Sequence, residues 1–168
     1  MRFLQLLLFG VGRPRRSPVR PRRTVAIPGT SDGLLRQIWL GVRRQWFPER
    51  PEIDEYVIMW SRRRQKRTLG TCFPTRKRVV IALELQDPEY HCWLEPLIYH
   101  EMCHAVLGRQ ADRNGRNMWH GPDFKALERR HPGSKPLDDW IRSGGWARAV
   151  RRARARSAAA HRRLRQTG

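Results

Sequence analysis

The sequence has few of the features that mark secreted and membrane proteins. It contains three cysteines in 168 residues, Cys72, Cys92 and Cys103, and no C-x-x-C pair. An odd number of scattered cysteines argues against a disulfide framework or a zinc ribbon and favours a reducing compartment. No apolar run approaches the roughly 18 residues that cross a membrane. The apolar segment at residues 1–11 lacks a small-residue cleavage site, so we expect a cytoplasmic chain.

Acidic residues are absent from both ends of the chain. The net charge is +20, but residues 31–146 hold 20 Lys and Arg against all 15 Asp and Glu, a net of +5, so the two ends carry the other +15. Basic segments of this kind attract polyanions, because binding releases the counterions that surround a polyanion. We therefore expect DNA contact through phosphates, without sequence preference. The expected location is near a bacterial nucleoid, or nuclear or organellar in a eukaryote.

The composition divides the chain into three parts. Residues 1–30 are basic and rich in proline, which predicts a disordered N-terminal segment. Residues 31–146 have the apolar content of one compact domain. Residues 147–168 are rich in arginine and alanine, which predicts a basic tail that is solvated or helical. We expect a monomer that does not bind membranes.

The apolar pattern of the central part predicts an α+β fold. Apolar side chains recur three and four apart in residues 34–46, as in a helix capped by Ser31 or Asp32. Three short strands of a small antiparallel sheet are predicted at residues 55–61, 68–73 and 78–85. Further helices are predicted at residues 96–108 and 122–130. The apolar side chains expected to cover the core after them are Leu137, Trp140, Ile141 and Trp146.

The predicted helix at residues 96–108 carries the motif H-E-x-x-H. His100 and His104 are four apart, so both imidazoles can lie on one helical face and bind one metal ion. Glu101 is offset by one residue, which keeps it off the metal but within reach of a water molecule there. The spacing predicts a single Zn²⁺ site with Glu101 as the catalytic residue. A buried helix whose two histidines merely form hydrogen bonds is the alternative.

A catalytic zinc ion usually has three protein ligands and one open position, so a third ligand is required. We predict His120, because the 16 residues after His104 allow the next helix to fold back and present its start to the site. The other candidates are Asp123, Glu128 and His131, since zinc proteases also use carboxylate ligands.

The motifs HEMCHAVLG at residues 100–108 and HGPDF at 120–124 resemble those of SprT-like zinc metallopeptidases, a family that includes Spartan-like DNA–protein crosslink proteases. The upstream segments WFPE, EYVIMWS, LGTC and RVVIALEL occur in a similar order, and the resemblance covers roughly residues 32–131. It implies that zinc is bound by His100, His104 and His120, with Glu101 as the catalytic glutamate. It also implies that the strand near residues 80–85 pairs with a substrate peptide. No cysteine follows Cys103, so the C-terminal zinc-binding region of some relatives is missing.

Together these patterns predict a metalloendopeptidase that cleaves proteins bound or crosslinked to DNA. The predicted DNA contacts lie in a central basic segment and in the C-terminal tail: Arg62, Arg63, Arg64, Lys66, Arg67, Arg151, Arg152 and Arg154. Two other functions remain open at this point. One is a non-catalytic nucleic-acid-binding protein with a structural zinc ion, and the other is a zinc peptidase whose substrate is unrelated to DNA.

Overall fold

Helix α2 (Gly33–Trp46) opens the part of the chain that the computed structural model describes, which comprises residues 31–108, 110 and 118–166. The predicted N-terminal segment at residues 1–30 lies outside it. A three-stranded sheet follows α2, and four helices follow the sheet, so the predicted α+β class is confirmed. None of the described helices combines the length and apolar character needed to cross a membrane.

Helix α2 forms as its sequence predicts. The Asp32 carboxylate accepts a hydrogen bond from the Leu35 backbone N–H at 3.2 Å and so caps the first turn. The face that carries Leu35, Trp39 and Val42 is buried, and the Trp39 indole donates a hydrogen bond to the Ile53 carbonyl at 3.2 Å. This helix therefore packs as one wall of the core.

The sheet is mixed, so the predicted all-antiparallel arrangement was wrong. Strands β1 (Val57–Trp60), β2 (Gly70–Phe73) and β3 (Arg78–Ile81) lie in the order β1-β3-β2. Strand β3 pairs antiparallel with β2, as expected for neighbours joined by a tight turn, but parallel with β1. The physical reason is the long basic segment after β1, which carries the chain past β3 before β2 begins and so leaves the central place to β3.

Strand β3 is shorter than predicted, because the residues after Ile81 turn into the 3₁₀ helix η3 (Leu83–Gln86). The last bond towards β2 is donated by the Ala82 N–H to the Leu69 carbonyl at 2.7 Å. The next donor, the Leu83 N–H, bonds to the Ser61 hydroxyl at 3.0 Å instead of a strand. The alternating apolar pattern continues through Leu85, and this misled the prediction.

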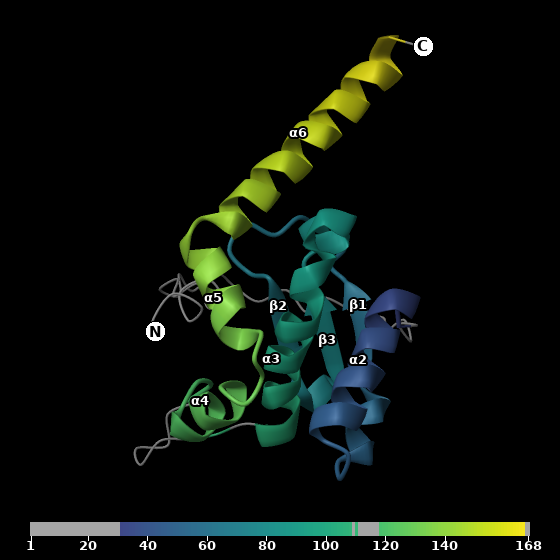
Figure 1. Cartoon of the computed structure of the whole chain (residues 1–168). Helices are drawn as coiled ribbons and strands as arrows, with labels where there is room; N and C mark the ends of the chain where they lie inside the picture. The colour runs from purple at the N-terminus through teal and green to yellow at the C-terminus, as the bar shows by residue number, and fades with distance from the viewer. Residues whose placement is uncertain (1–30, 109, 111–117, 167–168) are drawn as a thin grey trace, which may run out of the picture.

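Helix α3 (Leu94–Leu107) lies at the centre of the fold, with the sheet and α2 on one side and α4 (Pro122–Glu128) and α5 (Ser134–Arg142) on the other (Figure 1). It is buried around most of its circumference, and even its polar residues His100, Glu101 and His104 are buried. A helix with polar side chains in such a position indicates a functional site, because unpaired polar groups are costly to bury.

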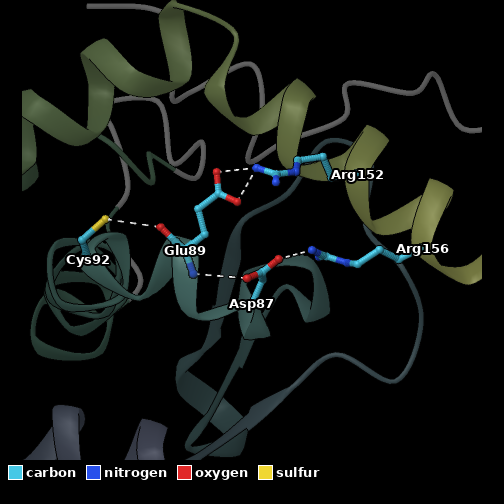
Figure 2. Close-up of polar contacts among 5 residues, drawn as sticks. All are labelled: Asp87, Glu89, Cys92, Arg152 and Arg156. Atoms are coloured by element: carbon cyan, nitrogen blue, oxygen red, sulfur yellow. Dashed lines mark hydrogen bonds and ion pairs between the residues drawn. The ribbon is translucent and has the colours of Figure 1, made fainter.

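Helix α6 (Gly145–Gln166) forms the C-terminal part of the structure, where a basic tail was predicted. Its first turns pack on the domain through Trp146, Ala149 and Val150, which are buried. Farther along, Arg152 pairs with Glu89 and Arg156 with Asp87, both in or next to the 3₁₀ helix η4 (Pro88–Trp93) that precedes α3 (Figure 2). The C-terminal half of α6 then extends away from the rest of the molecule (Figure 1).

Candidate metal centre

Helix α3 places two of the predicted metal ligands on one face. The ring centroids of His100 and His104 lie 5.1 Å apart. The helix ends just after them, where Gly108 has φ +62° and donates its N–H to the His104 carbonyl at 2.9 Å. Glycine adopts this left-handed conformation at no steric cost, so the predicted stop at residue 108 is explained.

His120 is brought to the same place by the helix that follows it. Helix α4 begins two residues later at Pro122, and the His120 ring centroid lies 5.4 Å from that of His100 and 4.8 Å from that of His104. One ring nitrogen from each of the three histidines lies within 4.8 Å of the others, so the group could hold a metal ion. The predicted helix is therefore present, with the candidate ligand His120 just before its start.

Phe124 fixes the distance between α4 and the three imidazoles. Its ring is buried, and its centroid lies 5.0 Å from His100, 4.4 Å from His104 and 4.6 Å from His120. An aromatic side chain in contact with all three rings limits their rotation and excludes water from one side of the group.

The other three candidates for the third ligand have different partners. Asp123 accepts a hydrogen bond from the Gln110 amide at 3.4 Å. His131 is buried between Trp46 and Tyr99, with Nε2 3.4 Å from a Glu95 oxygen. Glu128 reaches the site, but its Oε1 lies 2.6 Å from His100 Nδ1 and bonds to the imidazole.

The electrostatics of the three histidines suit a metal. Burial, together with the charge of the nearby His100 ring, lowers the pKa of His104 to about 2 and that of His120 to about 4, so both imidazoles are neutral at pH 7. Burial is the largest effect on His100 and opposes its protonation, but the hydrogen bond to Glu128 and the charges of nearby carboxylates together outweigh it and raise that pKa. His100 Nε2 is buried without a hydrogen-bond partner in the described part of the chain. Imidazole nitrogens in this arrangement fit Zn²⁺, which binds nitrogen ligands and takes three protein ligands in catalytic sites.

Glu101 lies beside the three histidines in a confined space. Its side chain is buried, and burial raises its pKa to about 7, partly opposed by the positive charge of His100 and by the Cys72 backbone N–H. Oε1 has no hydrogen-bond partner among the described residues. A carboxyl group with a pKa near neutrality can both accept and release a proton under physiological conditions.

Two residues of this site were not assigned these roles from the sequence. Gly70 makes room for Glu101, because a Cβ atom at position 70 would lie 2.4 Å from Glu101 Oε1. In the sequence, Gly70 belongs to the segment LGTC, which was used only as part of the family resemblance. Glu128 was considered only as a metal ligand, since spacing along the chain does not distinguish a ligand from a hydrogen-bond partner of one.

The comparisons with known proteins agree with this geometry. The model of the SprT-like family matches residues 36–136, more than half of the chain. The chain belongs to the SprT-like family. The matched range of this SprT-like protein includes Gly70, Glu101 and the three histidines, whereas α6 lies beyond it. Comparison with curated proteins and with solved structures gives no match.

The residues predicted to contact nucleic acid gather on one part of the SprT-like protein. Segment 62–67 is attached to the start of α6 by the Trp146 indole, which donates to the Lys66 carbonyl at 3.2 Å. It is also attached to η3, because the Gln65 N–H donates to Glu84 Oε1 at 2.9 Å. All eight predicted contact side chains are exposed. We use the name basic surface for two sets of exposed side chains: the arginines and the lysine of segment 62–67, and the arginines of α6.

Proposed function

We propose that this SprT-like protein is a zinc-dependent metalloendopeptidase that cleaves proteins bound or crosslinked to DNA. The observation that carries the proposal is the convergence of three histidine nitrogens within 4.8 Å of one another beside the buried carboxyl group of Glu101. Three imidazoles leave part of a tetrahedral zinc site open, which is the arrangement of catalytic rather than structural zinc.

His100, His104 and His120 would hold the zinc ion, and Glu101 would move the proton. Zinc in such a site acts as a Lewis acid that polarises the scissile carbonyl and activates water for attack. Glu101 accepts a proton from the attacking water as the C–O bond forms, and then delivers it to the leaving nitrogen as the C–N bond breaks. Its pKa of about 7 suits both transfers.

The sheet limits where a substrate peptide can pair with it. Strand β3, which contains part of the segment expected to bind substrate, has β1 on one side and β2 on the other. Backbone pairing with a substrate requires an edge strand, and β2 is the edge strand that adjoins Glu101 through Gly70 and Cys72. We therefore assign the substrate-pairing role to β2 in place of β3.

The basic surface supports the part of the proposal that concerns DNA. Segment 62–67 and α6 are far apart in the sequence, but the Trp146–Lys66 hydrogen bond joins the segment to the start of α6, and Arg64 and Arg156 line one surface pocket. Exposed cationic side chains bind the phosphate backbone whatever the base sequence is. A protease attached to DNA in this way would meet proteins that are bound to the same molecule.

The decisive experiment measures zinc content and cleavage of histone and casein by the purified protein, with and without DNA. We expect about one zinc per chain, zinc-dependent cleavage, and faster cleavage of the DNA-bound histone. Zinc without any cleavage would support a structural zinc in a nucleic-acid-binding protein. Equal cleavage with and without DNA would support a peptidase whose substrate is unrelated to DNA. Failure to bind zinc would refute the proposal.

A further inference from the structure

Glu128 at the end of α4 forms a short polar contact with a candidate metal ligand. Its Oε1 lies 2.6 Å from His100 Nδ1, and the imidazole is buried. A carboxylate has no proton to donate, so a hydrogen bond at this distance places the proton on Nδ1 of His100. The lone pair of the neutral ring is then on Nε2.

The other ring nitrogen of His100 is the one available to a metal. Nε2 is buried and has no hydrogen-bond partner among the described residues. Leaving such a nitrogen unpaired is costly in a protein interior, and a metal ion at the three-histidine group would satisfy it. The hydrogen bond that Glu128 accepts from Nδ1 therefore determines that Nε2 of His100 faces the site.

The backbone around Glu128 is held from two sides. The Tyr99 hydroxyl on α3 donates to the Leu127 carbonyl at 2.8 Å, and the Ser134 hydroxyl at the start of α5 donates to the Glu128 carbonyl at 2.8 Å. One turn earlier, Phe124 packs on the three imidazoles. Because α3 and α5 fix the end of α4, the carboxylate is presented to His100 from a rigid position.

We propose that Glu128 is a positioning residue of the metal centre, which holds His100 in the tautomer and orientation that direct Nε2 to the zinc ion. This inference rests on the proposed zinc function and adds a residue to it. Carboxylates that accept the second N–H of a metal-bound histidine fix the ring and raise its basicity, and their loss typically lowers metal affinity 10- to 100-fold.

A second carboxylate–histidine pair in the same fold supplies a matched control. Glu95 Oε1 lies 3.4 Å from Nε2 of His131, which is also buried. This pair touches none of the three histidines of the site in any described contact, so Glu95→Gln removes one negative charge beside a buried histidine without touching the metal centre.

The experiment measures zinc affinity by competition with a chromogenic chelator for the wild type, Glu128→Ala, Glu128→Gln and Glu95→Gln. We expect a loss of about 10- to 100-fold for Glu128→Ala. The loss for Glu128→Gln should be smaller, because the amide oxygen still accepts the Nδ1 proton. Glu95→Gln should bind zinc like the wild type. A folded Glu128→Ala variant with wild-type affinity would overturn the inference.

A measurement on the wild type covers the case in which Glu128→Ala does not fold. Long-range ¹H–¹⁵N NMR spectra of the zinc-loaded protein should show His100 protonated at Nδ1 and metal-bound at Nε2, and the reverse assignment would overturn the inference. A wild type that binds no zinc would refute the proposed function itself. Tight zinc binding that does not depend on Glu128 would refute only its positioning role.

Discussion

Glu101 and its surroundings define the site at the scale of single residues. A carboxyl group is buried next to three imidazoles, and burial raises its pKa to about 7. A structural glutamate at this position would be expected to satisfy both oxygens with protein donors, yet Oε1 has no partner in the described part of the chain. The carboxyl group is therefore available for a proton that comes from a reacting molecule.

Glu101→Gln should separate metal binding from catalysis. The amide has nearly the same shape as the carboxyl group but cannot accept the proton, so we expect cleavage of casein to fall by at least about 100-fold. Zinc content, measured by atomic absorption, should stay at the wild-type level because the three histidines are unchanged. Undiminished proteolysis would remove Glu101 from the proposed role.

Gly70→Ala should impair activity by moving Glu101. The added Cβ would lie 2.4 Å from Glu101 Oε1, so the carboxyl group must shift, and a displacement of about 1 Å can cost about 100-fold in rate. Zinc binding should persist.

The matched control is Gly41→Ala within α2, where no atom lies within 4 Å of the new Cβ. That change should leave cleavage unaffected and stabilise the helix by about 0.5–1 kcal/mol in urea unfolding. Equal activity of the two variants would show that position 70 does not constrain Glu101.

At the scale of elements, α4 assembles the site although it has only seven residues. His120 comes just before its first residue, Phe124 packs on the imidazoles from its middle, and Glu128 reaches His100 from its last residue. Phe124 and Glu128 are four apart and so lie on one face of α4, which directs both side chains towards α3, while His120 precedes the helix.

Helix α6 has two sets of arginines with different surroundings. Arg152 and Arg156 are four apart and face the carboxylates of Glu89 and Asp87 (Figure 2). Arg151 and Arg154 are exposed, and neither has an ion pair among the described residues. Arg154 acts on the Glu84 carboxylate at longer range, but without a direct ion pair the charge of the second pair is more available to phosphates than that of the first.

Replacing each pair by glutamine should test this difference, since each double variant removes two charges from one helix. We expect Arg151→Gln with Arg154→Gln to weaken DNA binding and to lower the slope of log affinity against log salt by about 2. The Arg152→Gln and Arg156→Gln control should lower it less, because nearby carboxylates already neutralise part of that charge. Fluorescence anisotropy at several salt concentrations measures both. Equal losses would show that the ion pairs do not restrain the control arginines.

At the scale of the whole molecule, the candidate metal centre joins two parts of the fold. His100 and His104 lie on α3 in the middle of the core, while His120 belongs to the start of α4. A metal ion bound to all three would connect these elements in the folded state only. Metal binding should therefore stabilise the fold by linkage.

Removal of zinc should lower the midpoint of thermal unfolding. At a free zinc concentration about 100 times its Kd, binding contributes about 2.7 kcal/mol to the free energy of unfolding. We expect the metal-free protein to melt several degrees lower in calorimetry and to recover when zinc is added back. His120→Ala, which removes one ligand, should show a smaller response to zinc. Identical melting curves with and without zinc would contradict a site formed by both helices.

Much of the fold and of the candidate site could be predicted because the signals are local. The capped amphipathic helix at residues 33–46, the H-E-x-x-H helix and its stop at Gly108 depend on neighbours three or four residues apart, and each is present. Strand β3 was predicted to continue beyond residue 81, because an alternating apolar pattern does not reveal that the Leu83 N–H donates to the Ser61 hydroxyl. Contacts between residues 22 positions apart leave no periodic trace in the sequence.

By itself, the sequence determined which residues are candidates for the chemistry: the histidine pair with its glutamate, a third histidine 16 residues farther on, and an excess of arginine in residues 147–168. Tertiary structure alone decided that β3 is the central strand and β2 an edge strand. It also decided that Glu101 occupies the space where a side chain at position 70 would lie, and that Glu128 accepts a hydrogen bond from His100. The physical reason is the range of the forces involved. Helix periodicity and capping act within a turn, whereas strand order, steric room and the partner of a buried imidazole depend on how distant segments pack.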